Sequence, residues 1–575
     1  MTNASFSKDI SIVLCGEAGQ GIQTVEFLLT RIMKLCGFNV YAAKEYMSRV
    51  RGGQNSTEIR ISGSGVNAFV DRIDILAALN KGALQHVQKR ISPQTLILAE
   101  KQNVPPEFDN GSGRFFDTPF TAAAIEIGDK LYSNMIAVGV LAGILKVDLP
   151  VVAEYVKTFF VKKADDVVRK NITAVTKGYD FGLGLIKAGH INIDIQSNEE
   201  IKNDILINGA QAVSLGAVAG GCNFITSYPM SPSTAVLVFL SSYAESFGIV
   251  AEQAEDEIAA INMAIGAWYA GARAMVTTSG GGFALMTEGV SLSAMLETPV
   301  VIHLAQRPGP ATGLPTRTEQ GDLELALYAG HGEFPRILLS PGSLEQAFDL
   351  SRRAFALADK YQSPVFILTD QYFIDSYYNI KSLDLSKLKI EKHIIEAPAD
   401  YKRYELTDNG ISPRGVPGFG KGLVCVDSDE HDEEGHITED LDLRVSMVDK
   451  RLKKLLAIKN DEIPPMLIGP EEYNNLVICW GSTLHPVEEA LKILNRDGLA
   501  MLHFSWIYPL PDVTAKYLEK AQKVMIVENN ATSQFAKLIR LCTGFEIENK
   551  ILKYNGLNFT VEELVEKIGK ILDEG

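Results

Sequence analysis

The sequence predicts an α/β protein of three successive domains, each built on a mostly parallel sheet. Short apolar runs of strand length alternate with amphipathic runs of helix length along most of the chain. The 575 residues are also too many for one hydrophobic core, because domains average roughly 150 residues. We therefore expect parallel strands with helices on both faces in each domain.

The first domain is predicted over residues 1–190. It begins with a buried strand at 11–15, the glycine turn GEAGQG and an amphipathic helix that ends at Gly37. Further strands are expected at 38–46, 57–62, 73–79 and 94–100, and helices at 134–145 and 152–160. The polar residues 191–205 are predicted to be a linker.

The second domain is predicted over residues 206–384. Its expected strands are 223–228, 273–279, 299–305 and 364–370, and its expected helices are 209–221, 255–272 and 344–361. Another helix is expected to start at Pro232 with Ser231 as its N-cap, because proline suits a first turn and serine hydroxyls accept from backbone N–H groups.

Residues 385–465 are less regular, and the third α/β domain is predicted over 466–575. Its expected strands are 476–482, 499–505 and 523–529, and its expected helices are 485–498, 513–521 and 533–542.

The composition excludes several classes of protein. The net charge of −16 and the pI near 5.2 argue against a nucleic-acid partner, which requires a basic face. No apolar run reaches the roughly 18 residues of a membrane span, and the first residues do not resemble a signal peptide. Six cysteines without a CxxC pair exclude a zinc knuckle or a self-contained iron–sulfur cluster and indicate reduced thiols in the cytoplasm.

The segment TSYPMSPST, with Tyr228, Pro229 and Ser231, combines a strand end, a tight turn and a helix start. Such a turn offers backbone N–H groups and a hydroxyl to a small anion. The alternative is an ordinary helix cap without a ligand.

Two more segments carry candidate functional side chains. The segment EQAEDEIAA allows two interpretations. Its acidic residues complement the dipole at a helix start. Alternatively, Glu257, which is followed by apolar residues, shares a proton with a nitrogen base. Arg307 ends a buried strand, where open α/β sheets bind ligands, and its fork suits a carboxylate. Thr316 follows in the same loop. The alternative for Arg307 is a surface position in a polar loop.

Two motifs indicate less. The glycines of GEAGQG are not spaced as in dinucleotide folds, so we discount NAD and leave close helix–strand packing or a cofactor contact open. The segment DSDEHDEEGH offers His431 and His436 to a metal, but a solvated acidic loop is the better interpretation.

Together these motifs closely resemble the α subunit of 2-oxoacid:ferredoxin oxidoreductases, in the form with the γ domain fused at the N-terminus. The likeness rests on GEAGQG, SRVRGGQNSTEIRIS, SYPMSPST, EQAEDEIAAINMAIGAWYAGARAMVTTSGGGFALM, QRPGPATGLPTRTEQGD and NGISPRGVPG. The resemblance implies a γ-like domain, a thiamine pyrimidine-binding domain and a transketolase C-terminal-like domain, in that order.

The resemblance also implies a thiamine-diphosphate enzyme divided between two chains, whose β subunit holds Mg and a [4Fe–4S] cluster. At matching positions, Glu257 binds the aminopyrimidine ring and Pro229 lies beside the cofactor. The implied substrate contacts are Tyr228, Ser231, Arg307 and Thr316. Lys44, from the first domain, is a further candidate that contacts either the substrate or coenzyme A. Ser231 stands where the family usually has threonine, so the hydroxyl is kept and a methyl is lost.

The implied reaction is reversible, coenzyme-A-dependent oxidative decarboxylation of a 2-oxoacid, with electrons passed to ferredoxin. The fused arrangement looks most like the 2-oxoglutarate type, which forms succinyl-CoA, and Arg317 is a candidate for the distal carboxylate. We expect a cytoplasmic (αβ)2 assembly without nucleic acid or membrane. The alternatives are pyruvate, branched-chain or aryl 2-oxoacids, or a non-catalytic assembly subunit.

Overall fold

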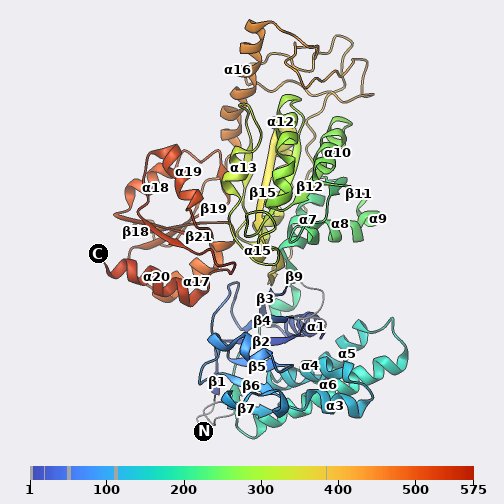
Figure 1. Ribbon diagram of the computed structural model, residues 1–575, viewed down its shortest axis with the longest axis vertical. Helices are drawn as coiled ribbons and strands as arrows, with labels where there is room; N and C mark the ends of the chain where they lie inside the picture. The colour runs from blue at the N-terminus through green and yellow to red at the C-terminus, as the bar shows by residue number, and fades with distance from the viewer. Residues whose placement is uncertain are drawn as a thin grey trace. The chain divides into compact units, whose positions relative to one another are not determined.

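The computed structural model describes residues 4–17, 20–47, 53–108, 114–383, 385–386 and 388–574. The chain forms two compact units (Figure 1), and each is described by itself. Unit 1 contains Met1–Ile207 and Asp375–Leu383, and unit 2 contains Asn208–Ile374 and Asp384–Gly575. The predicted α/β fold class is confirmed, whereas the predicted division into domains and linkers stays a prediction.

Unit 1 is built around an eight-stranded sheet with the order β7-β6-β5-β2-β4-β3-β16-β9. Its strands are β2 (Asp9–Glu17), β3 (Asn39–Glu45), β4 (Gln54–Ser62), β5 (Ile75–Ala78), β6 (Leu96–Ala99), β7 (Arg114–Asp117), β9 (Ile205–Asn208) and β16 (Tyr377–Ile380). Strands β2, β5, β6 and β7 are parallel, whereas β4 runs antiparallel to β2 and β3, and β16 antiparallel to β3. The sheet is mixed because the connection between β3 and β4 is too short for a crossover helix.

Helices cover both faces of this sheet. They are α1 (Ile22–Leu35), α2 (Ala83–His86), α3 (Phe120–Ile127), α4 (Ser133–Ile144), α5 (Leu149–Phe159) and α6 (Asp165–Lys187). The larger core joins α1 and α4 to one face, and a smaller core under α2 lies on the other. The sequence analysis did not predict α6, because its mostly polar surface hides a narrow buried stripe of small residues such as Gly178 and Gly182. A separate parallel pair joins β1 (Ala4–Phe6) to β8 (Ile191–Ile193).

Unit 2 contains a seven-stranded sheet with the order β11-β10-β12-β13-β15-β14-β20. Its strands are β10 (Phe224–Ser227), β11 (Val250–Gln253), β12 (Ala274–Thr278), β13 (Val300–Gln306), β14 (Ile337–Leu339), β15 (Pro364–Asp370) and β20 (Trp506–Tyr508). The helices along this part are α7 (Gly209–Ala219), α8 (Thr234–Ser242), α9 (Ala244–Phe247), α10 (Glu257–Tyr269), α11 (Gly280–Phe283), α12 (Thr287–Met295), α13 (Leu323–Tyr328), α14 (Leu344–Tyr361) and α15 (Gln371–Asp375). All its strand pairs are parallel except β14 with β20.

The start of α8 corrects one prediction. The helix begins at Thr234 rather than Pro232, and Ser233 rather than Ser231 occupies the N-cap position. The hydroxyl of Ser233 donates to the carbonyl of Met230 (2.6 Å), which closes a turn before the helix. The Ser231–Pro232 peptide bond within that turn is cis. Ser231 therefore lies on the exposed side of the turn, where its hydroxyl does not cap a helix.

A buried histidine joins three strands of this sheet. The ring of His303 on β13 lies between the hydroxyls of Thr277 on β12 (2.7 Å to Nδ1) and Thr369 on β15 (2.8 Å to Nε2). Burial lowers the pKa of His303 to about 3, so the folded protein holds a neutral ring. An unfolded histidine titrates near ~6.5. Below that pH the histidine is protonated in the unfolded chain but stays neutral in the folded protein. The free energy of unfolding therefore falls as the pH decreases.

Replacing His303 by glutamine should remove much of this acid sensitivity. Glutamine can donate to one threonine and accept from the other without a titrating group. At pH 5 the wild-type histidine is expected to cost about 2 kcal/mol of unfolding free energy relative to neutral pH. The measurement is the apparent melting temperature of wild type, H303Q and the exposed-site control H436Q at both pH values. Equal losses in all three would contradict the assignment.

The last part of unit 2 forms a five-stranded sheet with the order β17-β19-β18-β21-β22. Its strands are β17 (Met466–Ile468), β18 (Asn475–Trp480), β19 (Leu499–Phe504), β21 (Lys523–Glu528) and β22 (Asn549–Leu552). Its helices are α17 (Leu484–Leu494), α18 (Thr514–Lys520), α19 (Gln534–Thr543) and α20 (Val561–Asp573). Only β17 pairs antiparallel, so this sheet is also mostly parallel.

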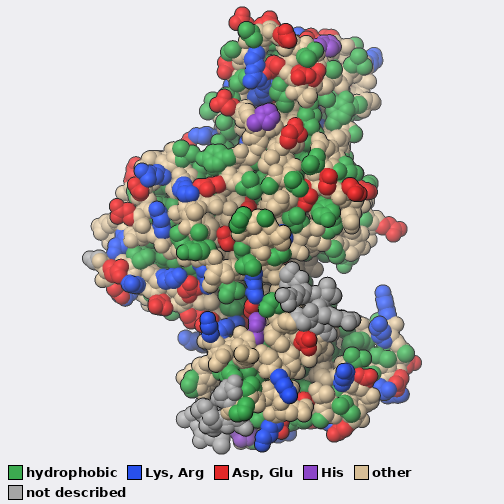
Figure 2. Space-filling view, in the orientation of Figure 1, with side chains coloured by type: hydrophobic (Ala, Val, Ile, Leu, Met, Phe, Trp, Pro, Cys, Tyr) green, Lys and Arg blue, Asp and Glu red, His purple; other side chains and the backbone are tan. Residues whose placement is uncertain are grey.

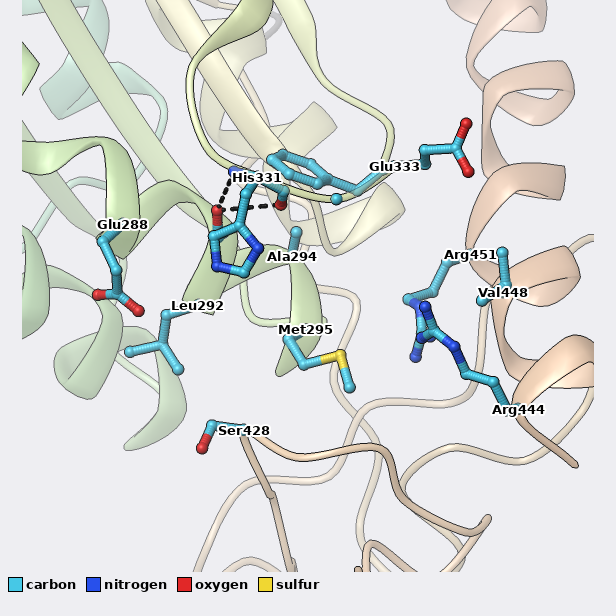
Figure 3. A pocket seen from close by; sticks show the side chains of 13 residues that line it. Glu288, Leu292, Ala294, Met295, His331, Glu333, Ser428, Arg444, Val448 and Arg451 are labelled. Atoms are coloured by element: carbon cyan, nitrogen blue, oxygen red, sulfur yellow. Dashed lines mark hydrogen bonds between the residues drawn. The ribbon is translucent and has the colours of Figure 1, made fainter. Parts of the chain in front are cut away.

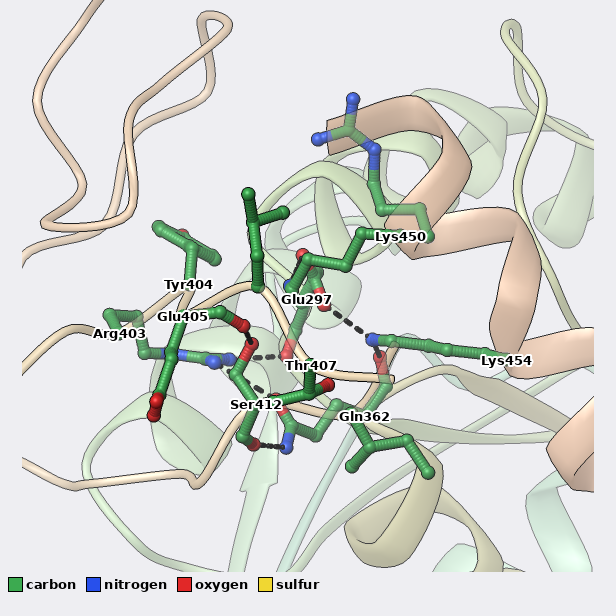
Figure 4. Close-up of polar contacts among 12 residues, drawn as sticks. Glu297, Gln362, Arg403, Tyr404, Glu405, Thr407, Ser412, Lys450 and Lys454 are labelled. Carbon is green, nitrogen blue, oxygen red and sulfur yellow. Dashed lines mark hydrogen bonds and ion pairs between the residues drawn. The ribbon is translucent and has the colours of Figure 1, made fainter. Parts of the chain in front are cut away.

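The region 385–465 contains a long helix that the sequence analysis did not predict, α16 (Leu441–Ile458). Lys450 and Lys454 on its inner side each lie 2.6 Å from the carboxylate of Glu297 (Figure 4), and all three side chains are 1% exposed. Arg403 donates to the backbone carbonyl of Glu297 (2.5 Å). Burial alone would raise the pKa of Glu297, but the two ammonium groups hold it well below its usual range. These buried ions anchor α16 to the end of α12.

Charged side chains of both signs are visible on one face of the molecule. On the face drawn in Figure 2, lysines and arginines are scattered among acidic side chains. Among the described residues, no helix is both long and apolar enough to cross a membrane.

Candidate active site

The candidate site lies at the carboxyl ends of β10, β12 and β13 in unit 2. The chain leaves β10 for the edge strand β11 and then returns past β10 to β12, so the strand order reverses at this point. Open α/β sheets bind ligands at such reversals, because the loops that follow adjacent strands diverge there. Tyr228 and Pro229 follow β10, the glycines 280–282 at the start of α11 follow β12, and Arg307 follows β13.

Glu257 is the first residue of α10 and points into this site. Asp256 caps the helix by accepting from the N–H of Ala259 (2.7 Å), so the carboxyl of Glu257 is left for another role. Glu257 is 4% exposed, and its Oε1 has no hydrogen-bond partner among the described residues. A Cβ on Gly282 would lie 2.6 Å from that oxygen, so only glycine lets the turn approach the carboxyl so closely.

Arg307 directly follows β13, and its side chain is buried, with 8% of the residue exposed. Its Nη1 donates to the backbone carbonyl of Ser231 (2.6 Å), which joins two predicted site residues that are far apart in sequence. Its Nε is buried without a partner in the described part of the chain. The guanidinium therefore keeps donor capacity for an anion.

Asp322 lies in the same site and was not singled out by the sequence analysis. Its two carboxyl oxygens occupy the space that a side chain on Gly280 would need. Its Oδ2 is buried without a hydrogen-bond partner among the described residues. The sequence offers little signal for it, since an acidic residue directly before a helix is also what an ordinary helix start contains.

The other predicted residues are placed as follows. Tyr228 is 41% exposed at the end of β10, and Pro229 follows it half-buried. Thr316 is half-buried in the loop after Arg307, and the described hydrogen bonds do not join the two. The stem of Arg317 packs against Gly556 in the C-terminal part of unit 2. The proposed roles of these residues stay predictions.

Unit 1 has its own cavity, of about 580 Å³, at the glycine turn of the GEAGQG motif. The starts of three helices meet at this cavity: Gly21 caps α1, Thr121 belongs to the first turn of α3, and Ser133 begins α4. Lys130 also lines it. Lys130 and the N-terminus of α1 favour an anionic ligand, whereas Glu17 in the same lining opposes one and the N–H of Thr121 is already bonded to Glu100. Residues 18–19 of the motif lie outside the described residues.

Lys44 lies elsewhere in unit 1, on β3. Its ammonium pairs with the buried carboxylate of Glu26 on α1 (3.3 Å) and lies 4.9 Å from the ring centre of Tyr377. Burial opposes its charge, but these neighbours raise the pKa of Lys44. The loop that follows it, residues 48–52, lies outside the described residues, and the role of Lys44 stays a prediction.

A second cavity of about 340 Å³ opens between α12 and α16 (Figure 3). Arg444 and Arg451 on α16 form one wall, but both pair with Glu430, so we assign no ligand to it. The nearby His431 is fully buried and stacks on Tyr404, which makes this segment more ordered than a solvated loop. The described residues contain no cluster of metal-ligating side chains.

The fold and the candidate site are those of an α/β protein with a candidate ligand site at the carboxyl ends of parallel strands. The family model for pyruvate flavodoxin/ferredoxin oxidoreductase, thiamine diphosphate-binding, matches residues 215–450, and that for pyruvate ferredoxin/flavodoxin oxidoreductase matches residues 11–181. The 2-oxoacid:ferredoxin oxidoreductase subunit alpha of a Sulfolobus species is 32% identical, over 98% of this chain and 97% of its own. The chain belongs to the family of 2-oxoacid:ferredoxin oxidoreductase α subunits.

Two further relatives are named for one substrate. The 2-oxoglutarate synthase subunit KorA of Archaeoglobus fulgidus is 33% identical over 63% of this chain and 97% of its own. The 2-oxoglutarate:ferredoxin oxidoreductase of Magnetococcus marinus, solved with 2-oxoglutarate, coenzyme A and succinyl-CoA bound, superimposes with a TM-score of 0.92 at 30% identity. That match covers 98% of this chain and 100% of the solved one.

Proposed function

We propose that this chain is the γ–α fused subunit of an oxidoreductase that converts 2-oxoglutarate and coenzyme A to succinyl-CoA and CO2 and passes the electrons to ferredoxin. The observation that carries this proposal is the buried Oε1 of Glu257, which lies beside the glycines 280–282 and has no hydrogen-bond partner among the described residues. The relatives named for 2-oxoglutarate support the choice of substrate.

The residues around Glu257 fit the aminopyrimidine ring of thiamine diphosphate. A buried carboxyl oxygen without a partner in the described part of the chain favours a polar group from a ligand, because leaving it unpaired is costly. The glycines at 280–282 let the backbone pass close to this carboxyl, since a Cβ on Gly282 would lie 2.6 Å from its Oε1. When bound, thiamine diphosphate supplies the carbanion chemistry that breaks the bond to the leaving carboxylate.

Glu257 then acts by holding a proton. With the cofactor bound, its Oε1 would share a proton with a ring nitrogen, and the buried neighbours Ala260 and Ile261 would exclude water. The N-cap Asp256 fixes the first turn of α10 and thereby the direction of the Glu257 side chain. Pro229, at the end of the adjacent strand, lies beside the same ring in this proposal.

Arg307 binds the carboxylate of the 2-oxoacid. Its hydrogen bond to Ser231 orients the guanidinium and leaves Nε and further N–H groups for the substrate. The exposed Ser231 hydroxyl, Tyr228 and Thr316 complete the substrate contacts in this proposal. Lys44 and the cavity at Gly21 in unit 1 serve coenzyme A, since helix starts and Lys130 favour its phosphates.

A partner subunit completes the enzyme in this proposal. Large apolar side chains are exposed on the β11 side of the seven-stranded sheet, on α8 to α10 and the turn after α11. They are Tyr228, Val238, Tyr243, Phe247, Val250, Ile258, Met263 and Leu285. An apolar surface of this kind indicates a protein partner. We assign it to a β subunit that holds Mg and a [4Fe–4S] cluster, in an (αβ)2 assembly.

Activity of the native complex tests this function. The complex is purified anaerobically from its own host, and coenzyme-A-dependent viologen reduction is measured with 2-oxoglutarate and with pyruvate. We expect reduction with 2-oxoglutarate and little with pyruvate. Reduction with pyruvate alone would keep the reaction and overturn the substrate. A chain that copurifies with no partner and shows no activity would overturn the proposal.

A further inference from the structure

The carboxyl of Asp322 lies in the same site as Arg307, but the proposed function assigns it no role. Its backbone N–H donates to Oε1 of Gln306, the residue before Arg307 (3.0 Å). Its carboxyl lies flat against Gly280, in the space where a Cβ would collide. The side chain is therefore held in place from two sides, and its Oδ2 is left without a partner among the described residues.

Few charges face this carboxyl. The charge of Glu319, in the loop that leads to α13, and that of Arg307, at the end of β13, act on it. The glycine turn 280–282 contributes no charge, and Glu324 on α13 pairs instead with Lys537 (3.0 Å). Burial raises the pKa of Asp322 to about 7, Glu319 adds to the rise, and Arg307 opposes it. The charge of Asp322 thus changes near neutral pH.

We propose that Asp322 is a positioning residue that controls the affinity of Arg307 for the substrate carboxylate. In its neutral form Asp322 leaves the charge of the arginine available to the 2-oxoacid. In its ionised form it competes with the substrate for that charge and repels the incoming carboxylate, because buried charges of like sign disfavour each other strongly. This inference rests on the proposed function, since it requires Arg307 to bind a 2-oxoacid.

The pH dependence of kcat/KM is the readout that separates this role from a structural one. Below pH ~7 Asp322 is neutral and binding is strong, and binding weakens as the pH rises. For the wild-type complex we expect kcat/KM for the 2-oxoacid to fall about tenfold between about pH 7 and pH 8.5, at saturating coenzyme A. Over the same pH range kcat should fall much less, because bound substrate favours the protonated form of Asp322.

Two variants test the assignment. D322N cannot ionise, so its kcat/KM should lose the decline at high pH. E319Q removes the negative charge that helps to raise the pKa of Asp322, so the decline should remain but begin at lower pH. Glu319 is half-buried and outside the proposed machinery, so E319Q should keep the wild-type kcat. Thiamine content and melting temperature of each purified complex show that the Glu257 side of the site is intact.

The outcomes separate the two claims. If the wild-type complex turns over a 2-oxoacid and both variants keep its pH profile, the role of Asp322 is refuted and the proposed function stands. If D322N does not assemble, an unshifted profile in E319Q alone refutes it. If the wild-type complex turns over no 2-oxoacid, the proposed function fails and this inference fails with it.

Discussion

Replacing Glu257 by glutamine is expected to lower kcat of the assembled enzyme at least about 100-fold, the usual effect of losing a positioned proton-holding group. Glutamine keeps the shape of the side chain beside Gly282 but cannot share a carboxyl proton at Oε1. The variant complex should therefore assemble and bind iron as the wild type does, with only the reaction impaired. Viologen reduction at saturating 2-oxoacid and coenzyme A measures the effect.

The matched control is E255Q. Glu255 carries the same charge two residues earlier, but its side chain is exposed. Turnover of E255Q should equal that of the wild type, which shows that loss of one acidic residue near the start of α10 is harmless. Wild-type turnover by E257Q in a fully assembled complex would exclude Glu257 from the reaction and would favour the alternative of a non-catalytic assembly subunit.

Replacing Glu297 by glutamine is expected to give the largest loss of stability, about 3–5 kcal/mol. The change leaves the ammonium groups of Lys450 and Lys454 buried without their shared carboxylate. Burial already lowers the pKa of Lys454 to about 8, although Glu297 opposes that shift. Urea unfolding of the purified subunit at neutral pH measures the loss, and α16 should be the first element to become accessible to protease.

Two variants check the reason for this loss. In E297Q/K454Q one of the unpaired charges is removed together with the carboxylate, so part of the stability should return. D512N breaks the exposed pair of Lys459 with Asp512 and should cost less than about 1 kcal/mol, because solvent screens that pair. If E297Q and D512N had equal effects, the buried cluster would not anchor α16.

Much of the fold could be predicted from the sequence where local pattern and tertiary role agree. The predicted strand 364–370 and helix 344–361 coincide with β15 and α14, because a continuous apolar run and a strong amphipathic period leave one interpretation. The helix α16 was missed because its inner side carries lysines, whose burial depends on a glutamate about 150 residues away. The strand β16 (Tyr377–Ile380) was missed because its partner, β3 (Asn39–Glu45), lies far away in the sequence.

The sequence by itself determined the family and the types of functional side chain. Glu257 and Arg307 could be selected because each directly follows a recognisable motif, and a strand end or a helix start is a local property. Only the tertiary structure decided how these groups meet. The hydrogen bond of Arg307 to Ser231 and the contact of Asp322 with Gly280 join residues from separate loops. The burial that changes the charge of Asp322 arises when those loops pack together, and no local pattern encodes that packing.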